Sequence, residues 1–232
     1  MRLDAYLVET YHFRSRGRAK QAVLNGYVKV NGNVIKKSAK DVSTGDDVDV
    51  AGGMDKPAGY FKLKSIQEHI ELIHEGDHVL DLGSSAGGFL TFASEIAKCV
   101  KGIEFSRIFR SELGKIAFEH ENVSVIFGDA FKISLDELSA GPVDVILSDL
   151  TLEPSDSLEV LERVLPLLKD EGRLLQVIKI KDRGNRKPVL RQIGLMGITI
   201  IDVLESRKEE IYIIGVKASE IADDGELENR KR

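Results

Sequence analysis

The fold is decided by the stretch VLDLGSSAGGF, residues 79–89 of the 232-residue chain. It has the pattern of a buried strand, a tight turn and the start of a helix, which is typical of α/β domains. Glycines in the turn let a cofactor approach the backbone, and the helix start offers unpaired amide groups. A nicotinamide dinucleotide site needs the spacing Gly-x-Gly-x-x-Gly, which this turn does not have. The stretch therefore predicts a different cofactor site, or else a purely structural turn.

Helices and strands alternate on both sides of this stretch. We predict helices at 62–74, 88–98, 107–119, 156–168 and 186–194, and strands at 78–82, 100–104, 123–127, 143–148, 173–180, 198–205 and 210–217. Apolar strand runs such as 143–147 indicate a sheet that is covered on both faces. The last two strands have no helix between them and therefore form an antiparallel pair. Seven strands with helical crossovers predict a doubly wound, Rossmann-like α/β domain at residues 60–218.

The first 50 residues predict a second, small α+β domain. Apolar residues at helical spacing indicate helices at 2–9 and 16–25, and short strands follow near 28–30, 34–35 and 48–50. The pair Asn31-Gly32 is a strong hairpin-turn signal. Residues 51–59 are small and include a proline, so we place a linker there. Residues 219–232 are rich in charge, and we expect this tail to be disordered.

Charge is distributed unevenly along the chain. The formal net charge is -5, but residues 1–40 carry nine Lys or Arg against only Asp4 and Glu9, a net of +7. The remaining residues therefore carry a net of -12. An acidic protein with a basic end is typical of a polyanion-binding module joined to another domain. A solvated basic face without a partner is the alternative.

Composition excludes several classes of protein. No apolar run reaches the ~18 residues that cross a membrane, and the first ten residues have no apolar core of the signal-peptide type. Cys99 is the only cysteine, so no internal disulfide forms and we expect a reducing, cytoplasmic compartment. Hydrophobic content of 42% and charged content of 31% fit a globular protein. We predict no metal site.

Two acidic residues stand at the ends of the strands that follow the glycine-rich turn. Glu104 ends the second strand and is expected to accept hydrogen bonds from the hydroxyls of a ribose. Asp129 follows the third strand and is expected to accept an adenine amino group. Each acid alone is also explained as a surface carboxylate, but the ends of successive parallel strands line one crevice. The three signals together resemble the class I S-adenosylmethionine-dependent methyltransferases. The cofactor contacts that this resemblance implies are Asp81, Gly83, Ser84, Gly87, Gly88, Phe89, Glu104, Asp129 and Asp149.

Four further charged residues match a family signature in order. Lys62 opens the first helix of the α/β domain, and Asp149 follows its fourth strand. Lys179 lies late in the fifth strand, and Glu210 opens the seventh. Within the segments FKL, LSD, VIK and EIY, they resemble the Lys-Asp-Lys-Glu tetrad of the FtsJ-like RNA ribose 2′-O-methyltransferases. The turn at 81–89 looks closest to the TlyA branch of this family.

Residues 1–50 resemble the small RNA-binding domain first named from a small-subunit ribosomal protein. The matching segments are Arg2-Leu3-Asp4, Ser15-Arg16, Ala19, Gly26 to Gly32 and Gly45-Asp46. An RNA-binding domain followed by an FtsJ-like domain is the TlyA arrangement. This resemblance implies a structured RNA as substrate and favours ribosomal RNA or a ribosomal subunit as partner. The residues expected to contact RNA phosphates are Arg2, Arg14, Arg16, Arg18, Lys20 and Lys29.

The tetrad implies a mechanism for methyl transfer from S-adenosylmethionine to a ribose 2′-hydroxyl. A hydroxyl is a poor nucleophile near neutral pH, so the reaction needs an in-line approach and a proton acceptor. We predict that Lys179 accepts the proton, with its pKa lowered by burial in the apolar run VIKI and by nearby Lys62. Asp149 and Glu210 would orient the two lysines, and Asp149 would also lie near the methionine end of the cofactor.

One segment departs from the family pattern, and two alternatives stay open. The family often has a small residue and a proline soon after the tetrad aspartate, whereas residues 150–154 here are LTLEP. That loop would border RNA and cofactor, so the identity of the substrate stays undetermined. A base methyltransferase would usually carry an Asn/Asp-Pro-Pro-aromatic motif or a catalytic cysteine, and Cys99 is expected in a helix away from the strand ends. A ribosome-assembly factor that binds RNA without catalysis is the second alternative, which the complete tetrad disfavours.

Overall fold

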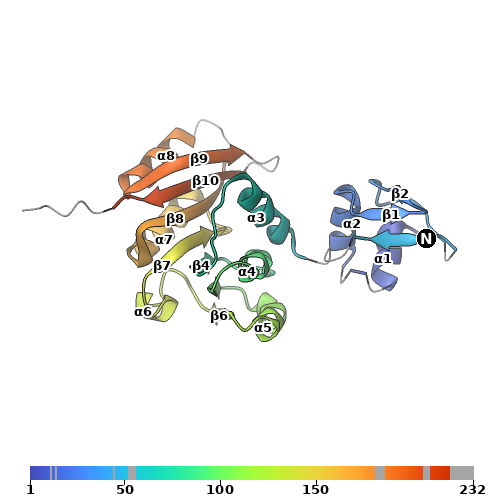
Figure 1. Ribbon diagram of the computed structural model, residues 1–232, viewed down its shortest axis with the longest axis horizontal. Coiled ribbons are helices and arrows are strands. Elements are labelled where there is room, and N and C mark those ends of the chain that lie inside the picture. Colours follow the sequence, from blue (N-terminus) through green and yellow to red (C-terminus); the bar gives the residue numbers. More distant parts are fainter. Residues whose placement is uncertain are drawn as a thin grey trace, which may run out of the picture. The chain divides into compact units, whose positions relative to one another are not determined.

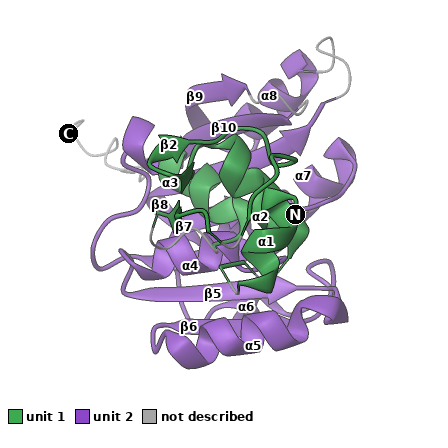
Figure 2. Cartoon of the chain, turned by 90° about the vertical axis from the view of Figure 1, so that its right-hand side faces the viewer, with its two compact units in different colours: residues 1–65 green, residues 66–232 purple. Residues whose placement is uncertain are grey.

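The computed structural model describes residues 1–10, 12–13, 15–43, 45–51, 56–180, 186–205 and 210–219. The chain divides into two compact units, residues 1–65 and residues 66–232 (Figure 2). The predicted tail lies outside the described residues, apart from Ser219. Within the described ranges, no helix is long and apolar enough to cross a membrane.

Among the described residues, the first unit contains two complete helices, a small antiparallel sheet and the beginning of a third helix, which starts at Ala58 (Figure 1). The helices are α1 (Leu3–Glu9) and α2 (Arg16–Leu24), and the sheet has the order β2-β1-β3, with β1 (Val28–Val30), β2 (Asn33–Val34) and β3 (Val48–Val50). Leu3, Leu7 and Val23 of the helices share one core with Val28 and Val30 of β1. Asn31 and Gly32 have φ angles of 52° and 77°, as a two-residue hairpin turn requires, so the predicted hairpin is present.

The second unit is built on a mostly parallel sheet of seven strands. They are β4 (His78–Leu82), β5 (Cys99–Glu104), β6 (Val123–Phe127), β7 (Val143–Ser148), β8 (Leu168–Lys179), β9 (Ile198–Glu205) and β10 (Glu210–Lys217), in the order β6-β5-β4-β7-β8-β10-β9. β10 lies antiparallel between β8 and β9, and the other neighbouring strands are parallel. The predicted Rossmann-like sheet with an antiparallel last pair is confirmed. The strand order reverses between β4 and β7, which is where such sheets bind ligands.

Both faces of this sheet are covered. The helical elements from residue 58 onward are α3 (Ala58–His69), α4 (Gly88–Ser94), η1 (Arg107–Phe109), α5 (Arg110–Glu119), α6 (Leu135–Leu138), α7 (Pro154–Val164), η2 (Leu165–Leu167) and α8 (Arg186–Leu195). Residues of α6, α7 and α8 share one apolar core with alternate strand residues such as Leu82 and Ile146. The strand residues between these, such as Val145 and Leu147, point to the opposite face and are also fully buried. The predicted doubly wound architecture is therefore present.

Several predicted boundaries are wrong. α3 begins at Ala58, so part of the expected linker is helical and Lys62 lies inside the helix instead of opening it. α4 ends at Ser94, and Cys99, predicted to be helical, is the first residue of β5. The apolar run around Cys99 fits a helix or a strand equally well. It forms a strand because Cys99 pairs with His78 of β4.

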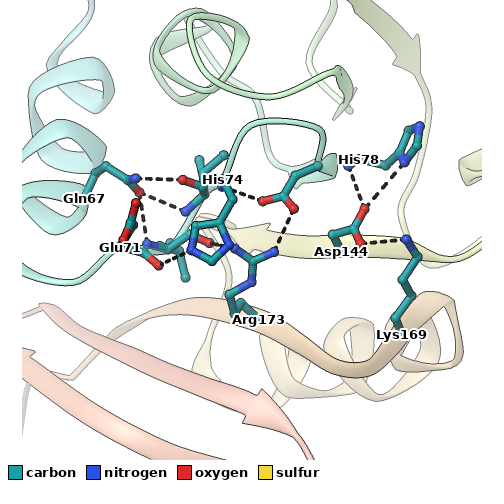
Figure 3. Close-up of polar contacts among 10 residues, drawn as sticks. Gln67, Glu71, His74, His78, Asp144, Lys169 and Arg173 are labelled. Carbon is teal, nitrogen blue, oxygen red and sulfur yellow. Dashed lines mark hydrogen bonds and ion pairs between the residues drawn. The ribbon is translucent and has the colours of Figure 1, made fainter.

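Arg173 joins β8 to the segment that precedes β4 (Figure 3). Its guanidinium donates to Asp77 Oδ1 at 2.8 Å and to the carbonyl oxygen of Leu72 at 2.9 Å. The second oxygen of Asp77 accepts the amide of His74 at 2.6 Å. Gln67 of α3 accepts the amide of Leu72 at 3.1 Å. These contacts hold the chain between α3 and β4 against the sheet.

Asp144 makes a second connection at the same end of the sheet (Figure 3). It accepts the amide of His78 at 2.9 Å and pairs with Lys169 at 2.6 Å. Burial acts to raise the pKa of Asp144, but the hydrogen bonds from Lys169 and His78 hold it below its ordinary value. The amino ends of β4, β7 and β8 are thus joined by side chains, and the loops at their carboxyl ends are left for a site.

Arg173→Ala is expected to lower the free energy of unfolding by roughly 3 kcal/mol, because it leaves a buried carboxylate without its cation. The side chains of Arg173 and Asp77 are only 18% and 9% exposed. Lys169→Ala breaks a pair whose lysine is 44% exposed and is expected to cost about 1 kcal/mol or less. Urea unfolding followed by circular dichroism measures both variants. Equal losses in the two variants would contradict the role given to Arg173.

Candidate active site

A cavity of about 450 Å³ lies at the carboxyl ends of β4, β5, β6 and β7. This is the point where the strand order reverses, as expected for a ligand site of a doubly wound sheet. Its wall includes four of the residues predicted to contact a cofactor, namely Gly83, Glu104, Asp129 and Asp149. Its other lining residues are Ser85, Ile103, Phe105, Ser106, Phe109, Gly128, Ala130, Phe131, Leu150, Thr151 and Leu152.

The glycine-rich turn brings backbone from two strand ends into contact. Gly83 has a φ of +85°, and a Cβ atom built on it would lie 3.0 Å from the carbonyl oxygen of Asp149. Gly87 has a φ of +77°, and its Cβ would lie 2.2 Å from Ile116 Cδ1. Both positions therefore require glycine. Ser85, between them, has a φ of +50°, which is a strained conformation for a residue with a side chain.

The remaining predicted residues of the turn do not line the cavity. Asp81, Ser84, Gly87, Gly88 and Phe89 are all buried, the last two in the first turn of α4. They lie in the core next to the residues of the turn that line the cavity.

Glu104 holds two loops of the cavity together. Its Oε2 accepts the amide of Ser85 at 2.7 Å, and its Oε1 accepts the amide of Ser106 at 2.6 Å. The side chain is buried, yet it lines the cavity. Because each carboxylate oxygen has two lone pairs, Glu104 can still accept hydrogen bonds from a bound ligand.

Asp129 is fixed at the end of β6. Its Oδ1 accepts the amide of Phe131 at 3.0 Å, and its Oδ2 pairs with Lys132 at 3.2 Å. The Phe131 amide and then Lys132 hold the pKa of Asp129 below its ordinary value. Asp129 is therefore a charged hydrogen-bond acceptor at the cavity wall.

Asp81 is a buried carboxylate without a hydrogen-bond partner in the described structure. It is 0% exposed, and neither of its oxygens, nor the hydroxyl of neighbouring Ser84, has a partner. Burial raises the pKa of Asp81 to about 7; nearby Ser84 opposes this rise, and the charges of Asp149 and Glu104 add to it. A buried acid in this state is satisfied by a cationic group, since an opposite charge favours the ionised form. Glu104, Asp129 and Asp81 are all hydrogen-bond acceptors, which fits a ligand that offers hydroxyl, amino and cationic groups.

Three residues of the predicted tetrad lie at the same end of the sheet as the cavity. Asp149 directly follows β7, and its amide donates to the carbonyl oxygen of Leu82 at 3.1 Å. Lys179 ends β8 and is the register partner of Glu210, which opens β10. The ammonium of Lys179 lies 3.5 Å from the hydroxyl of Thr151, and Thr151 lines the cavity. Antiparallel pairing and one loop therefore place Lys179 and Glu210 beside the cavity wall.

The burial predicted for Lys179 is wrong. Its side chain is exposed, because β8 ends at this residue and the apolar neighbours on either side point into the core. Lys62 is half-buried in α3 and belongs to the first compact unit. Its place beside the other three tetrad residues stays a prediction.

Two of the predicted RNA-binding residues, Arg2 and Arg16, contact a buried acid. Asp4 is 3% exposed and accepts hydrogen bonds from Arg2 at 2.8 and 3.1 Å and from Arg16 at 3.2 and 3.3 Å. The hydrogen bonds from Arg2, opposed by burial and aided by Arg16, lower the pKa of Asp4 to about 2. The side chains of Arg2 and Arg16 stay 50% and 59% exposed, so each presents further donors to solvent. Lys20 and Lys29 are exposed, Arg18 is half-buried, and Arg14 lies outside the described residues.

Most residues that line the cavity were not predicted from the sequence, and three of them show why. Phe105 directly follows Glu104, so its place after a strand end was the available signal. Thr151 lies in the loop that departs from the family pattern, and its contact with Lys179 depends on the pairing of distant strands. The left-handed backbone of Ser85 has no sequence signal. Among the described residues, no group of three or more His, Cys, Asp or Glu is arranged to hold a metal ion.

Comparisons with known proteins match both units. The model of the FtsJ-like methyltransferase family matches residues 58–180, more than half of the chain, and that of the S4 domain matches residues 1–48. A ribosomal RNA large subunit methyltransferase E of Syntrophobacter fumaroxidans is 27% identical over 182 residues, which cover 68% of this chain and 86% of the relative. A fibrillarin-like rRNA/tRNA 2′-O-methyltransferase of Methanospirillum hungatei is 30% identical over 109 residues, 47% of this chain and 52% of the relative.

The fold is also found among solved structures. Fibrillarin of Aeropyrum pernix, crystallised with natively bound S-adenosyl-L-methionine, has a TM-score of 0.59 at 22% identity, covering 75% of this chain and 80% of that one. The resemblance to the FtsJ-like methyltransferases, and that of residues 1–50 to a small RNA-binding domain, are therefore confirmed. The chain belongs to the FtsJ-like methyltransferase family and carries an S4 domain at its amino-terminal end.

Proposed function

We propose that the chain transfers a methyl group from S-adenosylmethionine to a ribose 2′-hydroxyl of ribosomal RNA. The observation that carries the proposal is the cavity at the strand ends. Asp149 and Thr151 line this cavity, and Thr151 contacts the ammonium group of Lys179. The names of the relatives, a ribosomal RNA methyltransferase and a 2′-O-methyltransferase, support the same reaction. With RNA as its partner, the chain would act in the cytoplasm.

The residues around the cavity fit S-adenosylmethionine. The backbone of Gly83 would approach the cofactor, Glu104 would accept its ribose hydroxyls and Asp129 its adenine amino group. Asp149, in the cavity wall, would face the cationic methionine end, and the buried charge of nearby Asp81 would act on it through the wall. When bound, the cofactor supplies a methyl group on a sulfonium.

The tetrad would remove the proton from the attacking hydroxyl. Lys179, at the end of β8, would hold the 2′-oxygen and accept its proton as the oxygen attacks. Glu210, opposite Lys179 in the sheet, and Asp149 would orient the lysine side chains. Positioning of the hydroxyl in line with the methyl group would supply much of the rate acceleration.

The direct test is incubation with methyl-labelled S-adenosylmethionine and total RNA, followed by mapping of the label. The proposal expects label on ribose, detected as linkages that resist alkaline hydrolysis. Label on bases would support the alternative of a base methyltransferase. Cofactor binding without any turnover would support an RNA-binding assembly factor.

We further propose that residues 1–50 form the RNA-binding domain and residues 60–218 the catalytic domain. The exposed Lys20 and Lys29 lie on α2 and β1 of the first unit. A Lys20→Gln/Lys29→Gln variant is expected to bind ribosomal RNA more weakly, with the slope of log affinity against log salt reduced by about 2, because each lysine neutralises one phosphate. Filter binding at several salt concentrations measures both quantities.

The matched control is Lys187→Gln, which changes an exposed lysine of α8. Affinity for the cofactor should be unchanged in both variants, as measured by calorimetry. A double variant with the salt slope of the unmodified protein would contradict the role of this unit in binding RNA.

A further inference from the structure

A second cavity of about 510 Å³ lies beside the first one, at the edge of the sheet formed by β5 and β6. The two cavities share part of their walls. β5, β6 and α5 lie together in this region (Figure 2). The residues lining the second cavity are Phe105, Ser106, Arg107, Arg110, Phe127 and Gly128.

The segment FSRIFR at residues 105–110 supplies most of this wall. Its two arginines are exposed, and it contains no acidic residue. Phe105 and Ile108 are 76% and 81% exposed, which is unusual for large apolar side chains that have no partner. The segment therefore presents apolar surface and positive charge side by side.

Arg110 makes a cation–π contact at this surface. Its guanidinium lies over the ring of Phe127, 5.1 Å from the ring centre. Such a contact leaves N–H donors of the guanidinium able to bind an anion. Arg107, in η1, adds a second guanidinium to the same cavity.

We propose that this surface, defined by residues 105–110 and Phe127, docks a nucleotide of the substrate RNA outside the target position. Ile108 would pack against a base, and Arg107 and Arg110 would bind the adjoining phosphates. Phe105, which lines both cavities, would separate the base from the cofactor. The charge of this surface favours RNA over an apolar protein segment. The six lining residues include two arginines and no acidic residue, which suits a polyanion. The inference rests on the proposed function, in that it takes RNA as the substrate.

An Arg107→Gln/Arg110→Gln variant tests the charge of this surface. With ribosomal RNA as the probe, its affinity is expected to fall about tenfold and its salt slope by about 1.4, if each arginine contacts one phosphate of a single strand. Ile108→Ser is expected to weaken binding several-fold with an unchanged salt slope, because it removes apolar contact and no charge. Arg191→Gln, on the exposed face of α8, is the matched control and should keep full affinity.

Calorimetry with S-adenosylhomocysteine accompanies each variant. Unchanged cofactor affinity together with weaker RNA binding supports the proposal. Unchanged RNA affinity and slope in the double variant would overturn it while leaving the proposed function standing. Loss of cofactor affinity alone would assign the second cavity to the cofactor and also overturn it. If the unmodified protein neither binds nor methylates ribosomal RNA, the proposed function itself fails.

Discussion

Lys179→Ala is expected to lower the rate of methyl transfer to RNA by a factor of about 10² to 10⁴, the range that loss of a positioned proton acceptor produces. The affinity for S-adenosylmethionine stays within about twofold, because Lys179 is not among the residues that line the cofactor cavity. Folding is also unaffected, since the side chain is exposed at the end of β8. Single-turnover kinetics with labelled cofactor, together with calorimetry, measure the two quantities separately.

Lys169→Ala is the matched control for this experiment. Lys169 lies on the same strand at the opposite, amino end, where it pairs with Asp144. Its removal should leave the single-turnover rate unchanged. A Lys179→Ala variant that methylates RNA at the full rate would remove Lys179 from the mechanism, and a slow Lys169→Ala variant would point to a general loss of structure.

Asp81→Asn is expected to raise the stability of the protein and to lower its affinity for the cofactor. In the folded protein burial raises the pKa of Asp81 to about 7, from an ordinary value of 3.8. Between these two pH values the folded state keeps a proton that the unfolded state has lost, so stability falls as pH rises through this window. Asparagine does not ionise. Above pH 7 the variant should therefore gain free energy of unfolding on the order of 4 kcal/mol, at ~1.4 kcal/mol per pKa unit.

Cofactor affinity should change in the opposite direction. The ionised Asp81 would attract the positive charge of the methionine end, so the affinity of the unmodified protein rises as pH approaches and passes 7. The variant has no such charge, and its affinity should be at least tenfold lower at pH 8 and nearly independent of pH. Thermal unfolding from pH 4 to 9 and calorimetry with S-adenosylhomocysteine, which keeps the ammonium group, measure both effects.

The control is Asp202→Asn, which makes the same chemical change at an acid whose pKa is lowered by a hydrogen bond from His69. The folded Asp202 stabilises the protein above its ordinary pKa, so this variant should show no gain at high pH. Unchanged stability of Asp81→Asn at pH 8 would show that Asp81 has a partner that satisfies its charge.

Local sequence patterns predicted the sheet and the glycine-rich turn, because strand runs and turn glycines act through neighbouring residues. They did not fix the end of α4, since the apolar residues around Cys99 fit a helix or a strand and only pairing with β4 selects the strand. Glu104 and Asp129 were predicted as strand-end acids. Their amide partners at Ser85, Ser106 and Phe131 come from loops that only the folded sheet brings close. The exposure of Lys179 likewise depends on where β8 ends.

In the loop after Asp149, side chains that pack against the core alternate with exposed side chains. Leu150 and Leu152 pack against the apolar core, whereas Thr151 and Glu153 are exposed. The backbone is thereby anchored at Leu150 and Leu152, while the exposed side chain of Glu153 is free of the contact that ties Thr151 to Lys179. Substitutions at position 153 are therefore expected to cost little thermal stability, which makes this position a starting point for engineering the RNA preference of the enzyme.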